Sequence, residues 1–228
     1  MKRILYIQKN ILNLRKKNLI NIGKSEAVVG RIMEIVLLDN KKEMCEAWNK
    51  YFNGINDVKI ICEYLEFASL DDVDCYVSPA NSYGLMDGGY DKALTMLFGV
   101  ELQRRVQDYI INNLYGEQQV GSSIIVDIPG ENKKLIHTPT MRVPSKIKNP
   151  EVVYTSMRST LICALKNNVK KIVIPAFGGA TGRLAPDVIA EEMYKAYIQV
   201  FKIDIKIHSW RDLAEREDMM YQYIKSKK

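Results

Sequence analysis

The sequence predicts one α/β domain, a layer sandwich in which helices cover a sheet. Short apolar runs that favour strands alternate with segments whose apolar residues recur at helical spacing, and this alternation is typical of that class. The chain has 228 residues, 47% of them apolar, and we find no internal repeat and no low-complexity tract. This composition is sufficient for one core of ordinary size and gives no sign of a second domain.

The first elements predict a β-α-β unit. The run at 34–38 is apolar and β-rich, and 58–62 returns as a second strand. Between them, residues 41–52 place Met44, Ala47 and Trp48 along one face of a helix.

Glycine and proline mark the boundaries of the later elements. Gly99 interrupts a long helical region, Pro129-Gly130 is a turn between two strands, and Pro186 suits the first turn of a helix. In chain order we expect a strand at 73–77, a helical region at 89–115, strands at 123–126 and 134–138, a helix at 150–167, a strand at 170–175, a helix at 187–201, an edge strand at 203–207 and a terminal helix at 210–224.

The cysteines and the start of the chain indicate the compartment. Four cysteines are widely spaced without a CxxC pair, and neither histidine lies near one in sequence. This indicates reduced thiols and no zinc site, and we expect no metal. The apolar run after Met1 is interrupted at Gln8, far short of a signal or membrane helix. We therefore expect a soluble protein without membrane contact, in the cytoplasm or, for a viral protein, in the host cytoplasm.

The net charge of +6 comes from the first 31 residues, which carry eight Lys or Arg and one acidic residue. Ile4, Ile7, Ile11 and Leu14 recur there at helical intervals, so one interpretation is a basic amphipathic helix that contacts nucleic acid or an anionic surface. The favoured interpretation is a poorly ordered extension at 1–32, followed by the domain proper at 33–228 with its terminal helix. The sequence leaves the oligomeric state open.

Two glycine-bearing loops follow strand ends. The first belongs to the stretch 75–91, which reads as a strand, a polar loop with Gly84, Gly88 and Gly89, and a helix; the second lies at 178–182. On one edge of an α/β sheet, such loops and the N-terminus of a helix suit phosphate oxygens, above all a diphosphate. Neither loop has the Lys-Ser/Thr pair of a P-loop or the G-x-G-x-x-G spacing of a dinucleotide site, so both of those classes are disfavoured.

Three motifs in order carry a resemblance to a known family. They are Ser78-Pro-Ala-Asn81, Gly88-Gly-Tyr-Asp91 and Ile174-Pro-Ala-Phe-Gly-Gly-Ala-Thr-Gly182, and Thr138-Pro-Thr-Met-Arg-Val-Pro144 adds to them. Over residues 33–201 the chain resembles the macrodomain family, which binds ADP-ribose and processes ADP-ribose 1″-phosphate, and within it the stand-alone bacterial and viral branch. The resemblance implies a three-layer α/β/α sandwich, with a mixed, mostly parallel sheet of about six strands and ADP-ribose in a cleft at the strand ends.

The resemblance also implies roles for the motif residues. Asn81 matches the asparagine that hydrogen-bonds the distal ribose, and its amide can donate and accept at once, which suits two neighbouring hydroxyls. The alternative is an asparagine tolerated in a left-handed turn. The diphosphate is expected between the two loops, on their backbone N–H groups. The residues assigned to ADP-ribose in this way are Ala80, Asn81, Gly88, Gly89, Tyr90, Phe177, Gly178, Gly179, Ala180, Thr181 and Gly182.

Asp91 decides whether catalysis is expected. Family members that remove ADP-ribose from acidic side chains, or deacetylate O-acetyl-ADP-ribose, have an asparagine and an aspartate ten residues apart, and Asn81 and Asp91 keep that spacing. A carboxylate there orients or deprotonates a water molecule. The competing interpretation, which is compatible with it, is a cap of the helix at 91–97.

The expected function follows from these residues and needs no cofactor. The chain binds ADP-ribose, and Asn81 and Asp91 orient water to hydrolyse an ADP-ribosyl ester, O-acetyl-ADP-ribose or ADP-ribose 1″-phosphate. The alternative is a non-catalytic reader of ADP-ribose or of ADP-ribosylated macromolecules.

Several positions depart from the family pattern. Phe67 stands where members carry an acidic residue for the adenine amino group; Glu66 beside it is a substitute, and Phe67 either stacks on adenine or fills the core. Asp87 stands where many hydrolases have glycine, and a carboxylate near a diphosphate is unfavourable unless it points away. Arg142 and Arg183 each have two interpretations, a phosphate contact or a solvated arginine.

Other polar residues are expected to be structural. We interpret His137 as a hydrogen-bonded core histidine and Cys75 as a small buried apolar residue. Ser78 and Ser82 lack the G-x-S-x-G context of a serine hydrolase.

Overall fold

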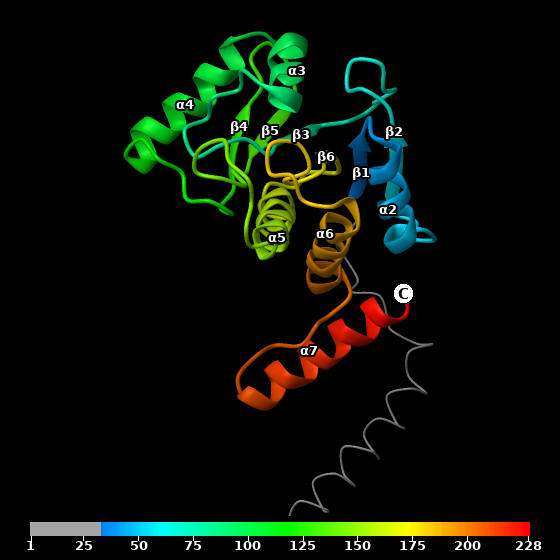
Figure 1. Ribbon diagram of the computed structural model, residues 1–228. Helices are drawn as coiled ribbons and strands as arrows, with labels where there is room; N and C mark the ends of the chain where they lie inside the picture. The colour runs from blue at the N-terminus through cyan, green and yellow to red at the C-terminus, as the bar shows by residue number, and fades with distance from the viewer. Residues whose placement is uncertain (1–32) are drawn as a thin grey trace, which may run out of the picture. The chain divides into compact units, whose positions relative to one another are not determined.

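The structure is a computed structural model that describes residues 33–228, and its centre is a six-stranded sheet with the order β2-β1-β6-β3-β5-β4 (Figure 1). Neighbouring strands are parallel except β4, which pairs antiparallel with β5. The predicted mixed, mostly parallel sheet of six strands is confirmed. The strands are β1 (Glu34–Asp39), β2 (Val58–Cys62), β3 (Cys75–Ser78), β4 (Ile124–Asp127), β5 (Lys134–His137) and β6 (Lys171–Pro175).

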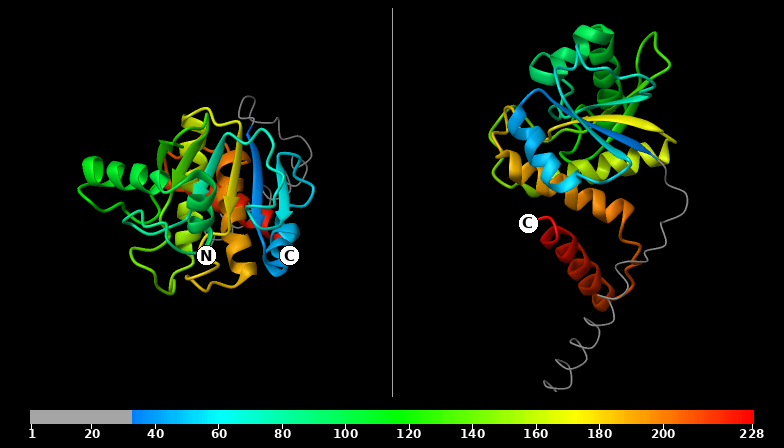
Figure 2. Two further views of the ribbon diagram at one scale, coloured as in Figure 1. Left: turned by 90° about the horizontal axis from the view of Figure 1, so that it is seen from above. Right: turned by 90° about the vertical axis from the view of Figure 1, so that its right-hand side faces the viewer.

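Helices cover both faces of the sheet, as Figure 2 shows, so the predicted three-layer sandwich is confirmed. α2, α5 and α6 pack against one face, α3 and α4 cover the other, and α7 packs on α6. The helices are α2 (Lys42–Phe52), α3 (Gly89–Phe98), α4 (Glu101–Leu114), α5 (Glu151–Lys166), α6 (Pro186–Phe201) and α7 (Trp210–Lys225). No helix within residues 33–228 is long and apolar enough to cross a membrane.

The alternation of side chains along the strands divides the interior into two cores. Ile35 and Leu37 of β1 belong to the core under α2, α5 and α6, whereas Val36 and Leu38 belong to the core under α3 and α4. A strand that is buried on both faces reads as one continuous apolar run. Because each fully buried aliphatic side chain contributes about 1.5–3 kcal/mol, such a run favours a central place in the sheet.

The order of elements agrees with the prediction except after α6. Gly99, with a φ of 86°, separates α3 from α4, and the turn between β4 and β5 contains Gly130 with a φ of 77°. The prediction of an edge strand at 203–207 is wrong, because this segment has no strand structure. Its alternating isoleucines serve packing instead, since Ile203 is buried and Ile205 lies against the core under α6.

The parallel strands end on one edge of the sheet. β6 lies between β1 and β3, and Leu38 of β1 is opposite Pro175 of β6, so the segments that follow these three strands begin side by side. Ligands of α/β proteins bind at this edge, outside the carboxyl ends of the strands. The basic extension predicted at 1–32 lies outside the described residues.

Candidate functional site

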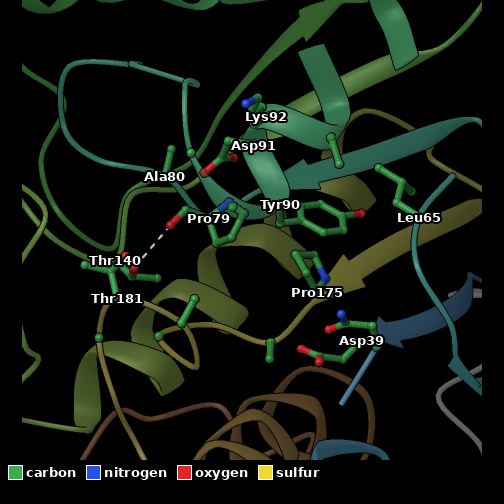
Figure 3. Close-up of a pocket in the computed structure, with 18 of the residues that line it drawn as sticks. Asp39, Leu65, Pro79, Ala80, Tyr90, Asp91, Lys92, Thr140, Pro175 and Thr181 are labelled. Atoms are coloured by element: carbon green, nitrogen blue, oxygen red, sulfur yellow. Dashed lines mark hydrogen bonds between the residues drawn. The ribbon is translucent and has the colours of Figure 1, made fainter. Parts of the chain in front are cut away.

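A cleft of about 680 Å³ lies at the carboxyl ends of β1, β6 and β3. Its volume is within the usual range of ligand pockets in proteins. Figure 3 shows Asp91 and Ala80 on one side of the cleft, Asp39 beside Pro175 on the other, and the ring of Tyr90 between them. The predicted glycine loops both contribute to its walls.

Asp91 enters the cleft from the first turn of α3 and is held by the end of β3. The fully buried Ser78 hydroxyl donates a 2.6 Å hydrogen bond to Oδ1 of Asp91. Burial raises the pKa of Asp91 to about 7, the Ser78 hydrogen bond acts in the opposite direction, and the negative charge of Asp87 raises the pKa further. Near neutral pH this carboxylate therefore exchanges a proton readily, which is the property of a general base.

The interpretation of Asp91 as a helix cap is wrong. α3 begins at Gly89 with Gly88 as its N-cap, and no side chain makes a capping hydrogen bond there. Asp91 lies inside the first turn, where the helix dipole still favours a negative charge. The helix terminus alone does not explain its hydrogen bond to Ser78.

The amide of Asn81 shapes the loop after β3. Its Oδ1 accepts hydrogen bonds from the backbone N–H groups of Tyr83 and Leu85, at 3.1 and 3.4 Å, and its Nδ2 donates to the carbonyl of Leu85 at 2.8 Å. Asn81 is 7% exposed and has no positive φ, so the left-handed turn proposed as an alternative is absent here. One Nδ2 hydrogen remains for a ligand.

A second segment supports this loop. Asn81 forms an isolated parallel bridge with Met141, and the hydroxyl of Thr140 donates to the carbonyl of Pro79 at 3.1 Å, the dashed line in Figure 3. Thr140 and Met141 line the cleft as well. The motif at 138–144 thus positions the asparagine loop.

The two glycine loops differ in why they contain glycine. A side chain at Gly182 would begin 2.5 Å from the carbonyl oxygen of Gly178, and Gly178 itself has a φ of 79°, so the second loop needs glycine in order to fold. Gly89 has a φ of 55°. Gly88 has neither constraint, because its φ is −138° and nothing lies within 4 Å of the place where a side chain would begin.

Most residues assigned to ADP-ribose by the sequence line this cleft. Those that do are Glu66, Ala80, Asn81, Gly88, Gly89, Tyr90, Gly178, Ala180, Thr181 and Gly182, and Asp91, predicted to be catalytic, lines it as well. Phe177, Gly179 and Phe67 are not among the lining residues, since the Phe177 ring is buried in the core and Phe67 is 73% exposed. The alternative that Phe67 fills the core is therefore wrong; its ring forms a T-shaped pair with the ring of Tyr64, with 6.3 Å between centroids.

The sequence interpretation missed the turn after β1. Asp39, Asn40 and Lys41 line the cleft; Oδ1 of Asp39 accepts the backbone N–H of Lys41 at 2.9 Å, and Nζ of Lys41 donates to the carbonyl of Gly179 at 3.4 Å. Burial raises the pKa of Asp39, while hydrogen bonds from the adjoining backbone lower it. The available signal was a polar residue at the end of an apolar strand, whereas Asn81 was identified by its match to the family motif.

Arg142 is held outside the cleft. Its guanidinium donates two hydrogen bonds to Glu117, at 2.7 and 2.8 Å, and lies over the ring of Tyr83, whose hydroxyl also donates to Glu117 at 2.9 Å. This clamp joins the motif at 138–144 to the asparagine loop. Arg183 is an exposed loop residue with a φ of 55°, and neither arginine lines the cleft.

His137 and Cys75 are core residues, as expected. His137 is fully buried, with Nδ1 2.7 Å from Oε1 of Gln118, and burial lowers its pKa to about 3, so the ring is neutral. Its Nε2 has no hydrogen-bond partner within residues 33–228. Burial raises the pKa of the Cys75 thiol, which makes it a poor nucleophile.

Comparison with known proteins adds a family and a fold. The model of a family described as Macro domain matches residues 77–193. An uncharacterized protein of Aquifex aeolicus is 32% identical over 123 residues, which cover 54% of this chain and 71% of that protein. A mutant Oceanobacillus iheyensis macrodomain with ADPR superposes with a TM-score of 0.52 at 21% identity, covering 68% of this chain and 88% of the other. The macrodomain of Mycobacterium tuberculosis DarG superposes with a TM-score of 0.50 at 18% identity, and the match covers 60% of this chain and 92% of the other.

Proposed function

The chain belongs to the Macro domain family, and from this premise we propose that it binds ADP-ribose in the cleft at the strand ends and hydrolyses an ADP-ribose derivative. The ADPR in the Oceanobacillus iheyensis macrodomain supports a ligand of this class. A cleft of about 680 Å³ offers room for a nucleotide-sized molecule.

The observation that carries the binding proposal is Gly88. Glycine is tolerated at a helix N-cap but ranks behind serine, aspartate and asparagine, and at this position neither backbone strain nor packing requires it. A ligand that approaches the backbone closely does require it. This supports a diphosphate between Gly88, Gly89 and Tyr90 on one side and the loop at 178–182 on the other.

The remaining groups of ADP-ribose are assigned from this arrangement. The distal ribose lies against Ala80 and Asn81, with Asp91 within reach of its anomeric end. The adenine lies at the far end of the cleft, toward Glu66 and Phe67. The ring of Phe177 makes no contact with the ligand in this proposal, because it is buried in the core and does not line the cleft.

The proposed reaction uses Asp91 as the base. The ionised carboxylate takes a proton from a water molecule, and the oxygen of that water attacks the ester carbon or the anomeric carbon of the substrate. The C–O bond to the leaving group breaks, and the proton then passes to the departing oxygen. An ADP-ribosyl ester gives ADP-ribose and a free carboxyl group, and O-acetyl-ADP-ribose gives ADP-ribose and acetate.

A second candidate is a reader that binds ADP-ribose without turnover. The observation in its favour is that three hydrogen bonds to loop atoms already use most of the Asn81 amide. A reader binds ADP-ribose tightly and releases no product.

The test has two stages. Isothermal titration calorimetry with ADP-ribose comes first, and an absence of binding at millimolar ligand would contradict the binding proposal. Release of ADP-ribose from an ADP-ribosyl ester, and of acetate from O-acetyl-ADP-ribose, is then measured for the wild type, Asn81→Ala and Asp91→Ala. Asp218→Ala, an exposed aspartate on α7, is the matched control. Turnover that Asp91→Ala abolishes supports the enzyme, whereas binding without turnover in the wild type supports the reader.

A further inference from the structure

Asp39 occupies a part of the cleft that the proposed function leaves unassigned. It is the last residue of β1 and faces the cleft beside Pro175, the last residue of β6 (Figure 3). Two local contacts orient its carboxylate, the 2.9 Å hydrogen bond from the Lys41 backbone and an interaction with the Asn40 backbone. A carboxylate has about four acceptor sites, so at least two remain for a ligand.

The local structure explains a short polar residue at position 39 but not its charge. The hydrogen bond from the backbone two residues ahead is an Asx turn that leads into α2, and asparagine makes this turn as well as aspartate. The N-cap of α2 is Lys41 and makes no side-chain capping hydrogen bond. Neither the turn nor the start of α2 therefore requires a negative charge at position 39; burial disfavours this charge, and attraction to Lys41 favours it.

The strand order indicates which part of the ligand meets Asp39. Along the edge of the sheet the order is β3, β6, β1 and β2, with neighbouring strands about 4.8 Å apart. In ADP-ribose the order is distal ribose, diphosphate, proximal ribose and adenine. With the distal ribose at the end of β3 and the diphosphate at the end of β6, the proximal ribose comes to the end of β1 and the adenine to the end of β2.

A direct contact supports the same alignment. Lys41, two residues after Asp39, donates from Nζ to the carbonyl of Gly179 at 3.4 Å, so the turn that carries Asp39 touches the second glycine loop. The group next to the diphosphate in the ligand is the proximal ribose and not the base. A carboxylate accepts hydrogen bonds from a pair of ribose hydroxyls, as acidic residues at strand ends do in dinucleotide-binding folds.

We propose that Asp39 determines specificity for the proximal ribose: it accepts hydrogen bonds from the 2′- and 3′-hydroxyls and excludes a ligand that carries a 2′-phosphate. The inference rests on the proposed binding of ADP-ribose. The exclusion is electrostatic, because a phosphate dianion at the 2′ position lies against a carboxylate in a partly buried site. The Lys41 ammonium attracts the Asp39 carboxylate, and its hydrogen bond to Gly179 directs it toward the glycine loop.

The experiment is calorimetry of the full chain with two ligands, ADP-ribose and ADP-ribose 2′-phosphate, at an ionic strength of about 0.15 M, where surface charges are screened over distances of about 8 Å. The proteins are the wild type, Asp39→Asn and the control Asp218→Asn, which removes the same charge from an exposed site on α7. We expect the wild type and the control to prefer ADP-ribose by at least about tenfold, or about 1.4 kcal/mol. Asp39→Asn keeps the Asx turn, and we expect its preference to fall to about twofold or less.

The outcomes separate the two proposals. If ADP-ribose does not bind to the wild type, the proposed function fails. If it binds but the wild type does not discriminate against the 2′-phosphate, the role of Asp39 is overturned. An equal loss of affinity for both ligands in Asp39→Asn, with the preference unchanged, overturns it too, and a thermal melt of each variant confirms that the protein measured is folded.

Discussion

The hydroxyl of Ser78 lies 2.6 Å from Oδ1 of Asp91 and donates a hydrogen bond to it. This hydrogen bond favours the ionised carboxylate, whereas burial and the charge of Asp87 favour the protonated form. The balance leaves the pKa of Asp91 at about 7, in the range where a side chain serves as a general base.

The pH profile of hydrolysis tests this balance. Only the ionised form of Asp91 accepts a proton from water, so the rate should rise with pH, reach half of its maximum near pH 7 and stay level above it. Ser78→Ala removes the interaction that lowers the pKa, and the midpoint should move to higher pH. The control is Ser69→Ala, since Ser69 is exposed and its hydroxyl donates to Asp71. A midpoint that is the same in all three proteins would contradict the assignment of Asp91 as the base.

Asp91→Asn should stabilise the protein at alkaline pH while abolishing turnover. The pKa of Asp91 is about 7 in the folded protein and about 3.9 in an unfolded chain, so between these values the folded state holds a proton that the unfolded state has lost. The wild type therefore loses stability as the pH rises from about 4 to 7, and asparagine has no such loss. Urea unfolding should show a gain on the order of 3 kcal/mol for Asp91→Asn at pH 8, and much less at pH 5. A gain independent of pH would refute this account.

Two glycine variants separate folding from binding. A side chain at Gly182 begins 2.5 Å from a backbone oxygen, so Gly182→Ala should cost more than about 2 kcal/mol of folding free energy and lose ADP-ribose binding as a consequence. Gly88→Ala meets nothing within 4 Å and should cost about 1 kcal/mol or less, the usual penalty at an N-cap. Calorimetry should nevertheless show at least tenfold weaker binding by Gly88→Ala, because the methyl group occupies the path of the diphosphate. Unchanged affinity in this variant would remove the main support for the first phosphate loop.

Arg142→Ala distinguishes a clamp from a phosphate ligand. Arg142 is exposed and pairs with Glu117 outside the cleft, so its loss should change the stability little and change the affinity for ADP-ribose by no more than about twofold. Arg104→Ala, which removes an exposed pair with Glu101 on α4, is the matched control. A tenfold weaker affinity in Arg142→Ala alone would show that the guanidinium reaches a phosphate.

Local sequence patterns predicted most of the fold. Apolar runs, helical periodicity and glycine or proline breaks depend on residues close in the chain, so the order of strands and helices could be inferred from them. The wrong prediction of a strand at 203–207 shows where such local patterns fail. Its alternating isoleucines satisfy the strand pattern, but a strand also needs a neighbour, and the sheet ends at β2 and β4 without this segment.

The sequence by itself determined that Asn81, Asp91 and the first glycine loop belong to one strand end, loop and helix start, and from this arrangement we predicted that they share one site. Only the tertiary structure decided which partners surround them. Ser78 donates a hydrogen bond to Asp91, and Asn81 makes hydrogen bonds within its own loop. Arg142 pairs with Glu117 outside the cleft, and Asp39 lines the cleft from β1, a strand distant in the chain. The physical reason is that β1 is brought to the cleft by its pairing with β6. The pairing of strands that lie far apart in the chain depends on the packing of the whole core, and no short stretch of sequence specifies it.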